Sequence, residues 1–516
     1  MKKGVSGLNQ IETEIHRIIA TVKRQQAQAG SWYYCLESGP MIDAYMIILL
    51  RTLNIHDEDF IRSVTEAIID KQEPNGAWKL FRDEEGGNLS ATIEAYDALL
   101  FSGHARVHIA PILITSDRKF SLKTERTPDV SDLYMKHRAT SINIQHRSLL
   151  SLIASGIQQL SYLPEHIHNL ATRRAEQFML DRIEPDGTLY SYFSATFLMI
   201  FALLALGYSE RHPIIVHAIT GLQTLSCKAN GRMHVQNSTS TVWDTALVSY
   251  ALQEAGVPYS STTIQRAGHY LLSRQQTKYG DWIVHNPNAA PGGWGFSDSN
   301  TIDLDVDDTT AALRAIHKLA KTNPIYRQAW ERGVSWVLSM QNDDGGWPAF
   351  EKNTDKEILR MLPISGTESV STDPSTADLT GRTLQFLGAD VGLHVQHPNI
   401  RRGVHWILKN QQEDGSWYGR WGESCRSDVV KKYVPLGAST LSQTAWAVDA
   451  LVAVSKETTP AIERGIQYLL DSGNKTDWTT AYPTGAGLPG GFYFYYHSYR
   501  YIWPLLALSH YKEKFT

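Results

Sequence analysis

The chain has 516 residues, with 49 basic and 53 acidic side chains and a formal net charge of -4. This length exceeds what one ordinary core organises, and we expect two large helical domains. The balanced charge contains no Lys/Arg block, which argues against a nucleic-acid partner. The first residues have no apolar core of a secretory signal, and the longest apolar run, Ala195 to Tyr208, is too short to span a bilayer. Membrane crossing is therefore excluded at this stage, whereas attachment to a membrane surface remains open.

One short phrase recurs along the chain: Gln, three residues, Gly, one residue, Trp. Five copies are found, at Gln26/Gly30/Trp32, Gln72/Gly76/Trp78, Gln276/Gly280/Trp282, Gln341/Gly345/Trp347 and Gln411/Gly415/Trp417. Two degraded copies lie at Ile183/Gly187/Leu189 and between Arg464 and Trp478. Such repeats indicate stacked units that bury a face only against their neighbours, and we interpret the repeat tryptophans as structural clamps between helices.

The segments between the copies have helical patterns. Apolar residues recur at three- and four-residue spacing in Met41–Leu50, Ser249–Leu252 and Ser442–Leu451, and alternation typical of strands is scarce. Paired helices in a closed array, an all-α toroid, are the predicted architecture. The long gap between the Trp78 and Trp282 copies divides the repeats into two clusters, which we interpret as two helical barrels.

Three cysteines, Cys35, Cys227 and Cys425, lie far apart in the sequence. Their spacing is not typical of a zinc site or of a disulfide framework, which favours a reducing cytoplasm.

The most unusual segment places four carboxylates, Asp303, Asp305, Asp307 and Asp308, at the start of a helical pattern. Like charges held this close cannot all ionise, so at least one carboxyl should keep its proton near neutral pH. Trp294 and Phe296, just upstream, supply aromatic faces that attract cations. An acid beside aromatic rings is suited to carbocation chemistry.

The same segment has two simpler interpretations, a calcium loop and a solvated acidic helix cap. A calcium loop fails, because its turn glycine would fall on Asp308 and its final glutamate on Arg314. A solvated acidic cap for the helix that begins near Ala311 remains an alternative.

Three features together resemble the squalene–hopene cyclases, the class II triterpene cyclases. They are the Gln–Trp repeats, the Asp305-Val-Asp-Asp-Thr309 box and the C-terminal phrase Gly490–Arg500. The resemblance runs from about Gln25 to Tyr511 and is strongest to the branch that cyclises tetraprenyl-β-curcumene in sesquarterpene biosynthesis.

The resemblance implies two α/α barrels, with the N-terminal barrel inserted into the C-terminal one. On this basis residues 1–30 belong with the C-terminal barrel, residues 31–235 form the inserted barrel, and residues 236–516 carry the acid motif. It also implies a cytoplasmic, monotopic protein on the cell membrane that takes a polyprenyl lipid and needs no metal or other cofactor. A homodimer remains open. Val107–Leu122 is our candidate for the membrane-facing surface.

The family's site residues map onto this chain one by one. The resemblance makes Asp307 the proton donor, supported by the anions of Asp305 and Asp308. The substrate-lining residues that it implies are the aromatics Trp243, Phe296, Phe350, Trp421, Phe492, Tyr496 and Tyr499. Aromatic rings offer a negative face to a carbocation without a nucleophilic lone pair.

The chain departs from the family pattern in two respects. Where hopene-forming members carry a His beside the acid, this chain has Arg382, four residues after Asp378, and we expect a fixed ion pair that positions and strengthens the acid. Family segments are also missing after His104 and after Gly422, the second about one repeat long. A barrel that has lost a repeat either closes smaller or leaks water.

Two alternative functions follow from the same residues. A class II diterpene cyclase would share the acid box, but needs Mg²⁺ and basic groups for a prenyl diphosphate. An inactive relative that binds a polyprenyl lipid is the second alternative, prompted by the missing segments.

Overall fold

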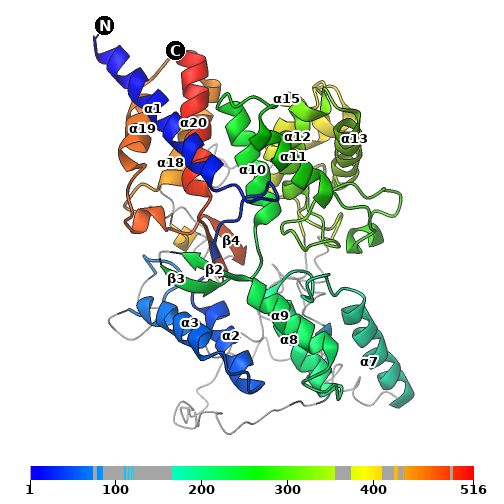
Figure 1. Ribbon diagram of the computed structural model, residues 1–516. Coiled ribbons are helices and arrows are strands. Elements are labelled where there is room, and N and C mark those ends of the chain that lie inside the picture. The colour runs from blue at the N-terminus through cyan, green and yellow to red at the C-terminus, as the bar shows by residue number, and fades with distance from the viewer. Residues whose placement is uncertain are drawn as a thin grey trace, which may run out of the picture.

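The structure is a computed structural model that describes residues 2–73, 78–84, 110–111, 114–115, 118, 120, 165–229, 231–354, 373–409, 424–427, 434, 436–488 and 492–516. Within these residues the chain is mostly helical, and its helices form two groups joined by short strands (Figure 1). The fold is all-α and is built as two α/α barrels.

The first group packs around its own apolar core, which includes Ile42, Leu49, Phe193, Phe197 and Leu222. It lies at the bottom of Figure 1 and comprises α2 (Met41–Thr52), α3 (Glu58–Asp70), α7 (Glu165–Leu180), α8 (Phe193–Ala205), α9 (Pro213–Thr224), β2 (Ser226–Ala229) and β3 (Arg232–Val235). Strands β2 and β3 form an antiparallel pair.

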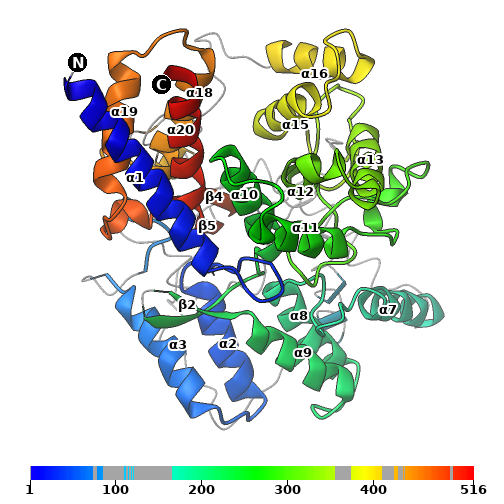
Figure 2. The ribbon, with the colours of Figure 1, turned by 45° about the horizontal axis from the view of Figure 1, so that its top comes forward.

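The second group contains the acid motif. It comprises α1 (Lys2–Arg24), α10 (Thr241–Glu254), α11 (Thr262–Arg274), η4 (Asp281–Val284), α12 (Val306–Ala320), α13 (Pro324–Ser339), α15 (Ala377–Ala389), α16 (Pro398–Lys409), α18 (Leu441–Val454), α19 (Pro460–Ser472), η6 (Trp478–Thr480) and α20 (Tyr499–Phe515). Helix α1 lies beside α19 and α20, so the start of the chain packs with its end (Figures 1 and 2). The predicted division of the chain into domains, with its boundaries, stays a prediction.

The burial of these helices shows which of them face inward. Nearly every residue of α10 is buried, and α12 is buried over most of its length. By contrast, α11 and α13 each bury one stripe that includes Ile264 and Trp336, respectively. A helix that is buried all round belongs to the interior, whereas one with a single buried stripe covers it. Helices α10 and α12 therefore form inner members of the barrel, and α11 and α13 pack outside them.

A small sheet lies between the two helical groups. Strands β1 (Leu36–Glu37), β5 (Phe492–Tyr496) and β4 (Gly485–Leu488) are antiparallel in the order β1–β5–β4, with Leu36 opposite Tyr496. The C-terminal aromatic phrase is thereby held against the segment that enters the first helical group.

The repeat tryptophans do act as clamps. The indole N–H groups of Trp32, Trp78 and Trp347 each donate to a carbonyl ten residues earlier, at 2.8, 2.9 and 2.9 Å. The backbone N–H of Trp347 also donates to Thr380 Oγ1 on α15, at 3.0 Å. The repeat glutamine closes the loop, since Gln341 Nε2 donates to the carbonyls of Gly345 and Asn399, both at 2.8 Å. Trp417 lies outside the described residues.

The third repeat was assigned to the wrong tryptophan. Trp282 lies in η4, and its indole nitrogen has no hydrogen-bond partner among the described residues. Trp294 makes the clamp instead: its indole N–H donates to Leu271 O at 2.7 Å, and its backbone N–H to Thr309 Oγ1 at 2.9 Å. The glutamine of this clamp is Gln275, whose Nε2 donates to Gly292 O at 2.7 Å, and the insertion between Gln275 and Gly292 hides this copy from a search at fixed spacing. Trp294 is fully buried and is therefore not a free cation-binding face.

The interpretation of the cysteines was also wrong. Cys35 and Cys227 form a disulfide across 192 residues of sequence, with Cα atoms 5.8 Å apart. Folding brings the end of the first repeat against β2, which sequence spacing does not reveal. The argument for a reducing compartment fails with it, and the location in the cell stays a prediction. None of the described helices has both the length and the apolar character needed to cross a bilayer.

The clamp geometry predicts unequal effects of two matched substitutions. Trp294→Phe leaves Leu271 O without its buried donor, and we expect it to lower the free energy of unfolding by about 1–3 kcal/mol more than Trp282→Phe. Both changes remove the same atoms from buried sites, so urea unfolding of the two variants isolates the hydrogen bond. Equal losses in the two variants would contradict the assignment of Trp294.

Candidate functional site

The acid motif forms the first turn of α12. Asp305 is the N-cap, and its carboxylate accepts the backbone N–H of Asp308 at 2.7 Å. Asp305 N donates to Trp294 O at 3.1 Å, and Val306 N donates to Ala349 O at 3.0 Å. The segment does cap a helix, but the helix begins at Val306 and not near Ala311. The segment is also not a solvated cap, because Asp305 and Asp308 are 5% and 3% exposed.

Asp305 and Asp308 interact as a buried carboxyl pair. Burial raises the pKa of Asp305 to about 6, and hydrogen bonds from Asp308 limit this rise. Burial raises the pKa of Asp308 well above its ordinary value, and the charge of Asp305 raises it further. The pair as a whole therefore favours holding one proton, as expected for like charges that cannot both ionise.

Asp307 has a different environment from its two neighbours. Arg382 Nη1 on α15 lies 3.0 Å from its Oδ2, and Arg382 Nη2 lies 3.0 Å from Asp378 Oδ2. Arg382 therefore bridges two carboxylates, only one of which was expected from the four-residue spacing. The Asp307 side chain is 26% exposed, so its carboxyl is accessible while the Asp305–Asp308 pair is not.

Burial and charge oppose each other at Asp307. Burial raises its pKa and the charge of Asp378 adds to this, whereas Arg382 and Arg314 lower it; the net shift is upward. At Asp378 burial also raises the pKa, but the charge of Arg382 and hydrogen bonds from Thr376 and Leu379 together outweigh it, and the net shift is downward. Of the two carboxyls that Arg382 contacts, Asp307 is thus the one that retains a proton to higher pH.

Four of the predicted aromatic residues lie together. Tyr496 and Tyr499 stack with ring centroids 4.4 Å apart and planes at 8°, and Phe296 meets Tyr496 edge-on at 6.4 Å. Trp243 Nε1 donates to the Tyr499 hydroxyl at 3.1 Å. Burial raises the pKa of Tyr499; the charge of Arg382 lowers it and the charge of Asp307 raises it, so the aromatic cluster and the acid interact electrostatically.

Phe350 is held by a carboxylate that the sequence did not identify. Asp373 accepts the backbone N–H groups of Ala349, Phe350 and Glu351 at 2.9, 2.5 and 2.7 Å. Because Val306 bonds to the carbonyl of Ala349, the same segment also fixes the start of α12. No recognisable pattern marks Asp373 in the sequence.

The remaining predicted residues lie outside this description. Trp421 is not among the described residues, and neither are the two junctions at His104 and Gly422. Phe492 belongs to β5, but its side chain is not described. Most of Val107–Leu122 is likewise outside the described residues.

A second carboxyl, Asp244, lies next to Trp243 of the aromatic cluster and was not among the site residues predicted from the sequence. Asp244 follows Trp243 on α10, is 1% exposed and accepts a hydrogen bond from Ser240 Oγ at 2.7 Å. Burial raises its pKa to about 7. The signal for it was present in the sequence, because it stands next to a predicted site residue.

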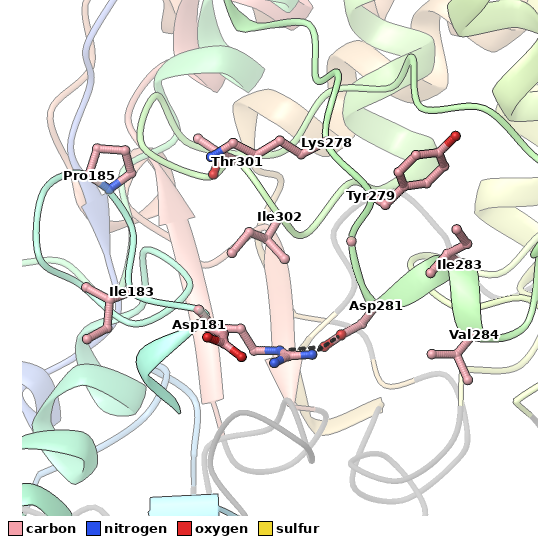
Figure 3. A pocket seen from close by; sticks show the side chains of 12 residues that line it. Asp181, Ile183, Pro185, Lys278, Tyr279, Asp281, Ile283, Val284, Thr301 and Ile302 are labelled. Atoms are coloured by element: carbon pink, nitrogen blue, oxygen red, sulfur yellow. Dashed lines mark hydrogen bonds and ion pairs between the residues drawn. The ribbon is translucent and has the colours of Figure 1, made fainter. Parts of the chain in front are cut away.

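A separate pocket of about 570 Å³ opens between the two helical groups (Figure 3). It is lined by residues 181–183 and 185, by residues 278–281, 283 and 284, and by Thr301 and Ile302. Asp307 does not line it, so this pocket is distinct from the acid and its aromatic cluster.

Comparisons with known proteins agree with this arrangement. The family profile described as the squalene-hopene cyclase C-terminal domain matches residues 239–423 and 421–513. The profile described as the N-terminal domain matches residues 15–105 and 100–231. Each domain matches in two pieces, which meet where segments were inferred to be missing.

Sporulenol synthase of Bacillus subtilis is 37% identical over 96% of this chain and 96% of its own length. That alignment spans 615 positions, so the relative contains residues with no counterpart in this shorter chain. Squalene–hopene cyclase of Alicyclobacillus acidocaldarius is 28% identical over 95% of each chain. The solved type II terpene cyclase MstE from Scytonema shares 15% identity over 56% of this chain and 91% of its own, with a TM-score of 0.32, a likeness too slight to define the fold.

An acid box at the start of an inner helix, in an all-α barrel clamped by Gln–Trp repeats, defines a class II terpene cyclase. The chain belongs to the squalene–hopene cyclase family, and two internal segments of that family are missing from it.

The environment of Asp244 predicts a pH-dependent contribution to stability. Its pKa is raised in the folded state, so its contribution is fully present below the unfolded value of about 3.9 and is lost as pH rises to about 7. In the parent we expect the free energy of unfolding to fall by about 4 kcal/mol between pH 4 and 8 because of Asp244, and we expect this fall to be absent in Asp244→Asn. Urea unfolding at several pH values measures this, and parallel stability curves for the variant and the parent would contradict it.

Proposed function

We propose that the chain protonates the terminal alkene of a long polyprenyl hydrocarbon and cyclises it through carbocations, with Asp307 as the proton donor. The observation that carries this proposal is the environment of Asp307. Its carboxyl is accessible, has a raised pKa and lies 3.0 Å from a permanent cation. No other carboxyl of the Asp303–Asp308 segment has an ion-pair partner within the described residues.

The geometry explains how a carboxyl can act as a strong acid. Before reaction, burial and the charge of Asp378 favour the protonated form of Asp307, because both raise its pKa. When the proton moves to the alkene carbon, the remaining carboxylate is stabilised by Arg382 and by the N-terminus of α12. The proton, with the π electrons of the alkene, forms a new C–H bond and leaves a tertiary cation on the substrate.

The aromatic cluster supports the next step of this proposal. Phe296, Tyr496 and Tyr499 form one cluster of rings, and a ring face stabilises a cation by about 0.5–2 kcal/mol. Burial raises the pKa of Tyr499 further above the physiological range, so its hydroxyl stays neutral. Phe350, Trp421 and Phe492 complete the proposed lining.

For the substrate we propose a thirty-five-carbon hydrocarbon of the tetraprenyl-β-curcumene type, with squalene as the comparison. Two observations support this choice: the identity to a sporulenol synthase and the Arg382 that replaces the family's His. Such a substrate is a lipid, so we further propose that the protein takes it from the surface of the cell membrane without spanning it.

One observation favours a second candidate. Each barrel lacks a segment that the family has, and an open barrel would admit water. On that account the chain binds a polyprenyl lipid without cyclising it. The diterpene alternative predicts dependence on Mg²⁺, which EDTA removes.

The direct test compares the parent with Asp307→Asn. We expect the parent to convert tetraprenyl-β-curcumene to a polycyclic product in the presence of EDTA, and Asp307→Asn to lower the rate by about 10²–10⁴-fold. Product is measured by mass spectrometry, with Asp449→Asn, on α18, as a matched control. Equal rates in the parent and Asp307→Asn would exclude Asp307 as the donor. Absence of product from the parent, with binding retained, would favour the lipid-binding candidate.

A second prediction concerns Arg382. Arg382→Gln removes the cation that stabilises the conjugate base, and we expect it to lower kcat on the order of 10²-fold with a much smaller change in KM. If Asp307 is the acid, kcat falls as the pH rises through its pKa. Because Arg382 lowers this pKa, the fall of kcat should occur at higher pH in Arg382→Gln than in the parent. A decline at lower pH than in the parent would contradict this role.

A further inference from the structure

A cluster of charged side chains that the cyclisation steps do not use lies on the strands at the junction of the two helical groups (Figure 1). Its centre is Glu37 on β1, whose side chain is 15% exposed. Glu37 Oε2 lies 2.8 Å from His497 Nε2, and Glu37 Oε1 lies 2.9 Å from Lys71 Nζ. His234 Nε2, on β3, lies 3.6 Å from Glu37 Oε1. One carboxylate therefore joins the first group, through Lys71 and His234, to the link between β5 and α20, through His497.

The partners of Glu37 keep its carboxylate charged and in one place. Burial raises the pKa of Glu37, but the hydrogen bond with His497 and the charges of Lys71 and His234 lower it, and the net shift is downward. Behind His234, Asp43 is 1% exposed, and its Oδ2 lies 3.3 Å from His234 Nδ1. Since a charge that is both buried and unpaired is costly, each member of this cluster restricts the others.

His497 connects the charged cluster to the predicted ring cluster. Consecutive side chains of a strand point to opposite faces, and here the His497 ring meets Tyr495 at 4.4 Å while Tyr496 stacks on Tyr499 at 4.4 Å. The backbone N–H of His497 donates to Cys35 O at 3.2 Å. His497 is thus held at both its backbone and its ring, and it stands in the chain between the two stacked tyrosines.

The strand that carries Glu37 is itself fixed to the first helical group. The disulfide of Cys35 with Cys227 joins its start to β2, and Leu36 N donates to Gln236 Oε1 at 2.6 Å. A contact can fix a neighbour only if its own support is rigid. Glu37 meets this condition, so the Glu37–His497 contact transmits the position of the first group to the rings.

A second His–carboxylate contact on the same helix offers a comparison. His510 Nδ1, near the C-terminal end of α20, lies 2.6 Å from Asp449 Oδ1 on α18. Both of these helices belong to the second group. The two contacts are chemically alike, but only that of His497 lies beside the stacked tyrosines and reaches the first group.

We propose that Glu37 and His497 are positioning residues for the ring cluster: their contact fixes Tyr496 and Tyr499 relative to the first helical group, and so sets where a cation is stabilised along the substrate. This inference rests on the proposed function of the ring cluster. Without the contact the rings can shift, the cation formed beside them loses its stabilisation, and the substrate leaves partly cyclised. The effect falls on how far cyclisation proceeds, and not on the proton transfer from Asp307.

The first test measures the products of His497→Ala. We expect the share of partly cyclised products to rise by about threefold or more, as a weakened cation–ring contact predicts, with KM within about twofold of the parent. His497→Gln carries an N–H donor at a reach similar to that of Nε2 and should restore the parent pattern. Glu37→Ala should give the same products as His497→Ala, and the double variant no larger change, because both remove one contact.

His510→Ala is the matched control, because it removes a like contact from the same helix. It should leave the product pattern unchanged even where it lowers stability. Unchanged products in folded His497→Ala would overturn the proposal, and so would equal changes in His497→Ala and His510→Ala, which would assign the effect to lost stability. Should His497→Ala fail to fold, His497→Asn, whose amide is too short to reach Glu37, takes its place in the comparison with His497→Gln.

A second readout needs no turnover. An alkyltrimethylammonium ion is a stable cation with a lipid-like chain, and the alcohol of the same chain length is its neutral counterpart. By isothermal titration calorimetry we expect His497→Ala to weaken binding of the ammonium ion by about threefold or more, and that of the alcohol much less. Equal weakening of the two probes, or none, would overturn the positioning of the rings. Failure of the proposed function would appear separately, as full activity of Asp307→Asn or as no product from the parent.

Discussion

The site depends on one contact: a permanent cation held 3.0 Å from a carboxyl whose pKa burial raises. Neither effect alone gives a useful acid. Burial without Arg382 would hold the proton too tightly, and Arg382 without burial would leave an ordinary ionised ion pair. Arg382 meets this requirement because it is shared with Asp378, whose negative charge offsets part of its effect on Asp307. The two opposing effects together set how readily the proton leaves.

The packing of the barrel helices fixes the position of the Arg382–Asp307 contact. Asp307 is on α12 and Arg382 is on α15, so their distance depends on how two helices pack. The clamps of the repeat join the same elements, since Trp294 bonds to Thr309 on α12 and Trp347 bonds to Thr380 on α15. The hydrogen bond from Val306 to Ala349 connects the loop after Trp347 to the first turn of α12. The repeats thus position the acid through these hydrogen bonds.

Much of this could be predicted from the sequence because the signals are local. Helical spacing identified the all-α fold, and the crowded box identified the carboxyls whose pKa values are raised. The Asp378–Arg382 pair followed from their four-residue spacing on one helix. The contact of Arg382 with Asp307 did not, because it requires the packing of α15 on α12. Asp373, the Cys35–Cys227 pair and the shifted clamp at Trp294 were missed for the same reason: each is defined by neighbours distant in sequence or by an insertion.

The most direct measurement of the central claim is the titration of Asp307 itself, by infrared difference spectroscopy of its protonated carboxyl with Asp307→Asn as the reference. The account predicts a pKa above the ordinary aspartic value of about 3.9, and a still higher value when Arg382 is replaced by Gln. A pKa at or below the ordinary value would show that Arg382 dominates burial. Asp307 would then be an ionised partner in a structural ion pair, and the proton for cyclisation would have to come from another group.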